Sequence, residues 1–254
     1  MKLAAAQVAS SPGDIARNVS RHVAIVEEAA SLAAEMVVFP ELSLIGYWPR
    51  LAATAATSPD DPRLHPLQAA SDRLGIVVAV GLPLATIGLP RIAMLLFRPH
   101  ETVVVHAKRL LHEDEVPYFA PGDEPHVVHV GDQRLAPGIC FEALQREHVD
   151  AVDALGATAY LVSVAKHARG VSEAHERLAA VAREYGLSVV MANAVGAFAD
   201  GVAGGRSAAW HAGGMLAASL DGVSEGLVCI GIGEAGQLGR DPARAHEFDH
   251  REER

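Results

Sequence analysis

The interpretation of this sequence depends on "LAPGICFEAL", residues 135–144. An apolar, β-prone approach leads to Cys140, and helix-favouring residues follow at once. A strand that breaks sharply into a helix exposes the turn residue and places it at the positive end of the helix dipole, which favours a thiolate over a thiol. Because free cysteine is also among the most buried residue types, packing is the alternative interpretation of Cys140. Cys229 lies mid-strand in "GLVCIGI" and is expected to serve packing alone.

Short β-branched runs alternate with helical patterns along the chain, among them "MVVFP", "TVVVHAK" and "TAYLVSV". This alternation predicts an α/β fold whose sheets are covered by helices. We expect one domain over residues 1–236 and a charged tail, 237–254, that is flexible or lies at a subunit interface. We expect Asp14 and Ser172 to cap helices and Gly186 to end one. Hairpin turns are expected at Gly131-Asp132 and Gly213-Gly214.

The composition excludes several classes of protein. The chain has 254 residues, of which 50% are hydrophobic, so it can bury a sizeable core. With 21 basic and 31 acidic side chains the net charge is −10, which argues against nucleic acid or an anionic membrane surface as a partner. No apolar run approaches the roughly 20 residues that span a bilayer. The two cysteines indicate no disulfide framework, and together these features predict a cytoplasmic protein.

Two further patterns are weak signals for cofactors. "GIGEAG", residues 231–236, matches the glycine spacing of dinucleotide-binding loops, but no helical pattern follows it. "HEDE", residues 112–115, is not accompanied by the ligand spacing of a zinc site. We therefore expect neither a metal nor a cofactor.

A base and a cation are available for Cys140 at the ends of two other predicted strands. "VVFPEL" ends in the region of Glu41, and "VVVHAKRL" in the region of Lys108. A thiol with a pKa of about 8.5 is little ionised at neutral pH, so a catalytic cysteine needs such groups nearby. Charged residues at strand ends of one α/β layer can converge on a site, although each residue taken alone is equally explained as a solvated charge.

The order and the residues of three segments resemble the motifs of the nitrilase, or carbon–nitrogen hydrolase, superfamily. These segments are "VFPELSLIGY", "AKRLLHEDEVPYFAPG" and "PGICFE". Softer similarities in "PGDIARN", "MANAVG" and "GGRSAAW" extend the resemblance over about residues 1–232. The resemblance implies a four-layer α-β-β-α sandwich, usually assembled as a homodimer, that works without a cofactor.

The same resemblance implies roles for four residues. Glu41 would be the general base, Lys108 the stabiliser of the oxyanion, Cys140 the nucleophile and Glu115 a second active-site glutamate. The implied reaction is hydrolysis of a non-peptide carbon–nitrogen bond in a small amide through a cysteine thioester, with release of ammonia or an amine.

Alternatives and substrate contacts stay open at this level. Phe141 stands where amidase-like members tend to have tyrosine and nitrile-cleaving members tryptophan, so a nitrilase using the same residues is an alternative. A catalytically silent scaffold of the same fold is another. The expected substrate contacts, for an amide or a nitrile, are Phe141, Tyr47, His167 and Arg169, the last two from "SVAKHARG"; either of these two could equally be solvated.

Overall fold

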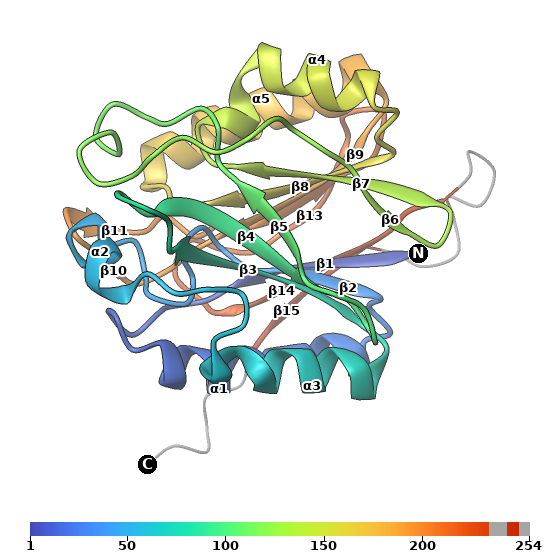
Figure 1. The fold of residues 1–254 in the computed structure, drawn as a ribbon. Helices are drawn as coiled ribbons and strands as arrows, with labels where there is room; N and C mark the ends of the chain where they lie inside the picture. Colours follow the sequence, from blue (N-terminus) through green and yellow to red (C-terminus); the bar gives the residue numbers. More distant parts are fainter. Residues whose placement is uncertain (234–242, 249–254) are drawn as a thin grey trace.

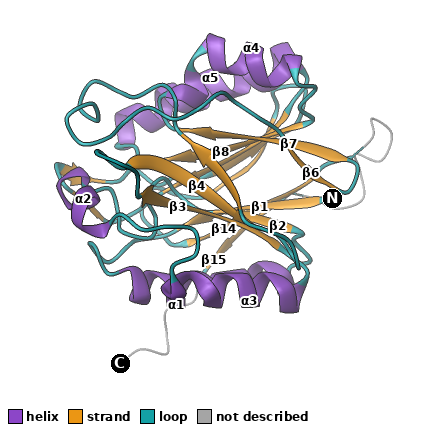
Figure 2. Ribbon diagram, in the orientation of Figure 1, coloured by secondary structure: helices purple, strands orange, loops and turns teal. Residues whose placement is uncertain are grey.

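The computed structural model describes residues 1–233 and 243–248. Two β-sheets pack face to face, and helices cover both outer faces (Figures 1 and 2). Helices α1 (Ile15–Ser31) and α3 (His65–Leu74) lie on one face, and α4 (Arg146–Ala154) and α5 (Ala168–Tyr185) on the other. The expected α-β-β-α sandwich is therefore confirmed.

The first sheet has seven strands in the order β15-β14-β1-β2-β3-β4-β5. Strands β1, β2 and β3 run parallel, and the other pairings are antiparallel. In sheet order the strands are Arg244–Glu247, Gly226–Gly231, Lys2–Gln7, Met36–Val38, Val77–Leu84, Arg91–Phe97 and Val104–Ala107.

The second sheet has six strands in the order β13-β12-β9-β8-β7-β6, with β7, β8 and β9 parallel. In sheet order these are Leu216–Ser219, Ala208–Trp210, Ser188–Asn193, Ala159–Val164, Gln133–Ile139 and Val128–Val130. A small hairpin and short helical segments complete the described elements: β10 (Ala197–Phe198), β11 (Gly201–Val202), η1 (Pro49–Leu51), α2 (Ala52–Ala55), η2 (Pro62–Leu64) and η3 (Glu142–Leu144).

The main core lies between the two sheets. Strand β1 packs against β9, β2 against β8 and β4 against β7. The central strands are buried along almost their whole length and are rich in valine, leucine and alanine, as expected for parallel strands covered on both faces. This packing brings the ends of strands from different sheets to the same side of the molecule.

The helix signals in the sequence are confirmed at two of three positions. The Asp14 side chain accepts a hydrogen bond from the Arg17 N–H at the start of α1, and Gly186 ends α5 in the left-handed conformation. Ser172 was expected to cap α5, and this is wrong. Helix α5 begins one turn earlier, at Ala168, and the Ser172 hydroxyl bonds the Ala168 carbonyl inside the helix. Just before this start, the Lys166 N–H donates to the Asn193 side chain, a contact between distant segments that the local sequence does not reveal.

The expected turns and tail differ in detail. Gly131-Asp132 joins β6 to β7 as a two-residue connection. Gly213-Gly214 lies within a longer connection between β12 and β13, and the pairing of these two strands shifts its register between Ala209 and Trp210. Of the expected tail, Arg244–Glu247 forms the edge strand β15 against β14 and is not loose. Residues 237–242 and 249–254 fall outside the described part of the chain, as does the end of "GIGEAG". Within the described residues, no helix is long and apolar enough to cross a membrane.

A close backbone approach fixes the segment that follows β5. The Gly122 N–H donates to the Lys108 carbonyl at 2.7 Å. A Cβ atom on Gly122 would lie 2.0 Å from the Ala107 carbonyl oxygen, a distance that no side chain tolerates. Glycine is therefore required at position 122 for the loop to return to the end of β5.

We expect Gly122→Ala to lower the free energy of unfolding by about 1–3 kcal/mol or more, as overpacked sites do. Chemical denaturation followed by circular dichroism measures the effect. Gly213→Ala is the matched control, because a Cβ there meets no heavy atom within 4 Å. Equal stability of the two variants would contradict the packing argument.

Candidate active site

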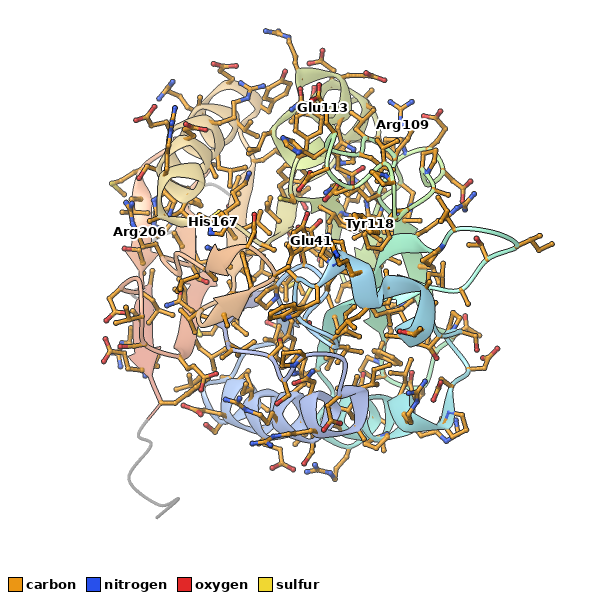
Figure 3. All side chains as sticks on the ribbon, turned by 90° about the vertical axis from the view of Figure 1, so that its left-hand side faces the viewer. Glu41, Arg109, Glu113, Tyr118, His167 and Arg206 are labelled. Carbon is orange, nitrogen blue, oxygen red and sulfur yellow. The ribbon has the colours of Figure 1, made fainter. Side chains whose placement is uncertain are left out.

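Glu41 lies in a tight turn after β2. The following residue, Leu42, has a φ of 54°, and the Leu44 N–H donates to the Gly81 carbonyl at 2.9 Å. Gly81 on β3 lets this turn approach, since a Cβ there would lie 2.4 Å from the Leu42 nitrogen. The turn holds Glu41 at the centre of one side of the molecule, between His167 and Tyr118 (Figure 3).

Lys108 directly follows β5 and is fully buried. Its ammonium lies between two carboxylates, with Nζ 2.8 Å from Glu41 Oε1 and 2.6 Å from Glu115 Oε1. Its backbone is fixed as well, because its N–H donates to the Ile92 carbonyl and its own carbonyl accepts from Gly122. The ammonium thus has a defined position shared by both glutamates.

Glu115 is the one buried acid in "HEDE". Besides the lysine, its carboxylate accepts hydrogen bonds from the Tyr47 hydroxyl at 3.2 Å and from the His112 N–H at 2.7 Å. Glu113 and Asp114 are exposed, and Figure 3 shows Glu113 farther toward the edge of the molecule. Burial therefore distinguishes Glu115 from its two acidic neighbours.

Cys140 occupies a strained turn after β7. Its φ is 48°, in the region that residues other than glycine rarely adopt, and its N–H donates to the Ser163 carbonyl at 2.8 Å. The expected helix after Cys140 is replaced by the single 3₁₀ turn η3, and α4 begins only at Arg146. The strong dipole predicted for this position is therefore missing.

The electrostatics of the two carboxylates and the lysine follow from burial. Burial opposes the charge on Lys108, but the negative charges of Glu41 and Glu115 outweigh it and raise the pKa of the ammonium. Burial raises the pKa of Glu41 to about 7, opposed by Lys108 and reinforced by Glu115. Glu41 Oε2 is buried and has no hydrogen-bond partner among the described residues. This oxygen is available to take up a proton near neutral pH.

The pKa of the Cys140 thiol differs from the sequence-based expectation. Burial and the charge of Glu41 raise it to about 11, although Lys108 and then Lys166 act in the opposite direction. The dipole argument predicted a lowered pKa and is wrong, because the long helix is absent and the sulfur is buried. The resting thiol is protonated and needs a base to become a nucleophile.

Glu142 joins the two segments that carry Lys108 and Cys140, a role the sequence did not reveal. Its buried carboxylate accepts hydrogen bonds from the N–H groups of Arg109 and Leu110, just after the lysine, and of Ile139, just before the cysteine. His106 Nε2 lies 2.7 Å from the same carboxylate. Burial alone would raise the pKa of Glu142, but these contacts lower it and keep the group ionised. An acid four residues after Gly138 carries no sequence signal for this role.

The same carboxylate belongs to a group with the composition of a metal site. Among the described residues, the donor atoms of His106, Glu142 and His148 lie within 4.8 Å of one another. The Glu142 oxygens are already engaged by several N–H groups, however, and one nitrogen of His148 bonds the Pro137 carbonyl. These contacts favour a structural anchor beneath the cysteine turn over a metal centre.

A cavity of about 510 Å³ opens above the cysteine. All four expected substrate contacts line it, and Lys166, whose position the sequence did not single out, lines it as well. The full lining is Tyr47, His112, Asp114, Glu115, Cys140, Phe141, Ala165, Lys166, His167, Arg169, Gly170, Glu173, Phe198 and Asp200. The cavity therefore combines aromatic walls with a charged rim.

Comparison with solved structures finds amidases of the nitrilase superfamily. An amidase variant from Nesterenkonia sp. AN1, in which acrylamide has added to the active-site cysteine, has a TM-score of 0.84 and 25% sequence identity, covering 92% of this chain and 93% of that one. A cysteine-to-alanine variant of the same amidase in complex with butyramide has a TM-score of 0.82 and 26% identity, covering 91% and 90%. These values describe similarity over nearly the whole of both chains.

The comparison of sequences gives a relative that is matched over part of its length, and a family. The glutamine-dependent NAD(+) synthetase of Aquifex aeolicus (strain VF5) is 27% identical over 92% of this chain, which spans only 43% of that protein's length. The family model described as "Carbon-nitrogen hydrolase" matches residues 2–235. Taken with the geometry above, this match shows that the chain belongs to the carbon–nitrogen hydrolase family.

Proposed function

We propose that the protein hydrolyses a small amide, R–CO–NH₂, through a thioester on Cys140. The observation that carries the proposal is the buried ammonium of Lys108 held between Glu41 and Glu115, beside a cysteine in a strained turn that faces a cavity. The bound acrylamide and butyramide of the Nesterenkonia amidase support a primary amide as the substrate class.

In the first half of the reaction, Glu41 takes the proton of the Cys140 thiol, and the sulfur attacks the amide carbon. The ammonium of Lys108 and the backbone N–H of Phe141 stabilise the oxyanion that develops. As the tetrahedral species collapses, the carbon–nitrogen bond breaks, and Glu41 returns the proton to the departing nitrogen. The products of this half are ammonia and a thioester.

In the second half, Glu41 activates a water molecule that attacks the thioester. The carbon–sulfur bond breaks, the acid R–COOH leaves, and the thiol is regenerated. Glu115 acts through Lys108 and through the Tyr47 hydroxyl, and it fixes the ammonium where the oxyanion forms. A nitrile would use the same nucleophile. Measuring ammonia release from a panel of small amides and from the matching nitriles separates the two activities.

Cys140→Ala should abolish turnover of the best amide, by more than about 10⁴-fold, because no thioester can form. Cys229→Ala is the matched control, since that thiol is buried within β14. Ammonia release by both variants gives the answer, and mass spectrometry of the wild type quenched during turnover should show the acyl adduct on Cys140. Undiminished activity of Cys140→Ala would exclude this mechanism.

The value of kcat/KM should rise with pH through a midpoint near 7. Glu41 must be ionised to accept the thiol proton, and its pKa is raised to about 7, so the base is protonated and inactive below that pH. Initial rates between mildly acidic and mildly alkaline buffers, with thermal melts in the same buffers, measure the profile. A flat profile in the range where the melts show a folded protein would remove Glu41 from the role of base.

Glu115→Gln should reduce kcat by about 10²-fold or more, because the ammonium of Lys108 loses one of its two carboxylate partners. Glu113→Gln is the matched control: it removes the same charge two residues away, on an exposed side chain. Both variants are assayed for ammonia release and melted thermally. If they retain equal activity, Glu115 has no part in the reaction.

A further inference from the structure

The acidic and basic side chains of the described residues that line the cavity lie in acid–base pairs, with one exception; the two histidines among them are charged only when protonated. His112 lies beside Asp114, and His167 beside Asp200. Arg169 forms an ion pair with Glu173 on the next turn of α5, and Glu115 with Lys108. Within the described part of the chain, no ion pair or side-chain hydrogen bond is made by the ammonium of Lys166.

The backbone of Lys166 is fixed beside the proposed nucleophile. Its N–H donates to Asn193 Oδ1 at 2.9 Å, and its carbonyl accepts from the Asn193 side chain at 3.1 Å and from the Gly204 N–H at 2.8 Å. Strand β8 ends two residues before Lys166. The carbonyls of its last two residues accept hydrogen bonds from the N–H groups of Cys140 and Glu41. Lys166 is therefore carried by the same strand that supports the site.

The side chain of Lys166 runs along Gly170 in the first turns of α5. A Cβ on Gly170 would meet the lysine stem at 3.7–3.8 Å, so the stem lies against the helix at a residue without a side chain. Lys166 lines the same cavity as Cys140, and it is half-buried there. The cavity thus has a partly sheltered cation in its wall, in a chain whose net charge is −10.

We infer that Lys166 binds an anionic group of the substrate, and that the preferred amides carry a carboxylate at the end opposite the reacting amide. The negative charges at the rim do not prevent this, because Asp114 and Asp200 are 59% and 71% exposed and are screened by water. The aromatic rings of Tyr47, Phe141 and Phe198 line the same cavity and offer apolar surface to the carbon chain of such a substrate. This inference rests on the proposed function and names its substrate class.

A second role for Lys166 predicts a different result. If the lysine served only to ease ionisation of Cys140, its removal would slow all amides by the same factor. If it binds the substrate carboxylate, its removal would act on anionic amides selectively and chiefly through KM. The informative quantity is therefore the ratio of kcat/KM for an anionic amide to that for a neutral amide of the same length.

The test compares the monoamides of malonic, succinic, glutaric and adipic acid with the corresponding neutral diamides. In the wild type, the best monoamide should exceed its diamide by about 10-fold or more in kcat/KM, the size expected for one charged hydrogen bond. In Lys166→Met this ratio should fall toward one, with most of the change in KM, and Lys166→Arg should restore part of it. The control is Arg73→Gln, which removes one positive charge from an exposed site on α3. An unchanged ratio in Lys166→Met, or no preference in the wild type, overturns the inference.

Failure of the proposed function is distinguished by a binding measurement that needs no turnover. Isothermal titration calorimetry of Cys140→Ala should show tighter binding of the best monoamide than of its diamide, and the added change Lys166→Met should remove the difference. If the wild type hydrolyses no amide but this difference is present, the anion site stands and the amidase proposal fails. If neutral amides are hydrolysed and the difference in binding is absent, the amidase proposal stands and the anion site fails.

Discussion

The structure depends on one buried ammonium held between two buried carboxylates. Lys108, Glu41 and Glu115 are almost wholly removed from water, and an unpaired charge in such a place is strongly destabilising. Each group is therefore tolerable only while the other two are in position. That requirement explains the tight backbone approaches around them. Because Gly81 and Gly122 have no Cβ atom, the turn of Glu41 can pack against β3 and the loop after Lys108 can pack against the end of β5. Burial of Glu41 raises its pKa, Lys108 opposes the rise, and the second carboxylate, Glu115, reinforces it.

A protonated thiol beside a carboxyl group that titrates near neutrality differs from a pre-formed thiolate. Because burial raises the pKa of Cys140, the sulfur stays unreactive until a proton acceptor and a substrate are present together. Nearby cations favour the ionised sulfur once the proton has moved. In the proposed mechanism this arrangement couples activation of Cys140 to Glu41, so that one carboxylate serves both the attack and the release of the amine.

The sequence predicted the layers because the strand and helix signals are local, and the resemblance to the nitrilase superfamily pointed to Glu41, Lys108, Cys140 and Glu115, which the structure places near one another. Charged residues directly after β-branched runs mark strand ends, and the chain places Glu41 and Lys108 there. Features that depend on distant partners were missed. Ser172 is a good capping residue, but α5 starts before it, just after the Lys166 N–H donates to the distant Asn193. The helix expected after Cys140 is not continuous, and the buried Glu142 in its place bonds N–H groups from the Lys108 segment. Among the described residues the ammonium of Lys166 makes no ion pair, and no spacing in the sequence encodes this, because it depends on how the other charged side chains of the cavity pair.

The candidate site is divided between the two sheets: Glu41 and Lys108 follow strands of the seven-stranded sheet, and Cys140 and Lys166 follow strands of the six-stranded sheet. The sulfur and its base are therefore kept in register by the apolar layer between the sheets and by Glu142, which bonds both segments. A slight slide of one sheet over the other would separate them without breaking any strand. In the proposed mechanism the rate therefore depends on how the two sheets pack against each other. Core substitutions far from the cavity would then change the rate before they change the fold.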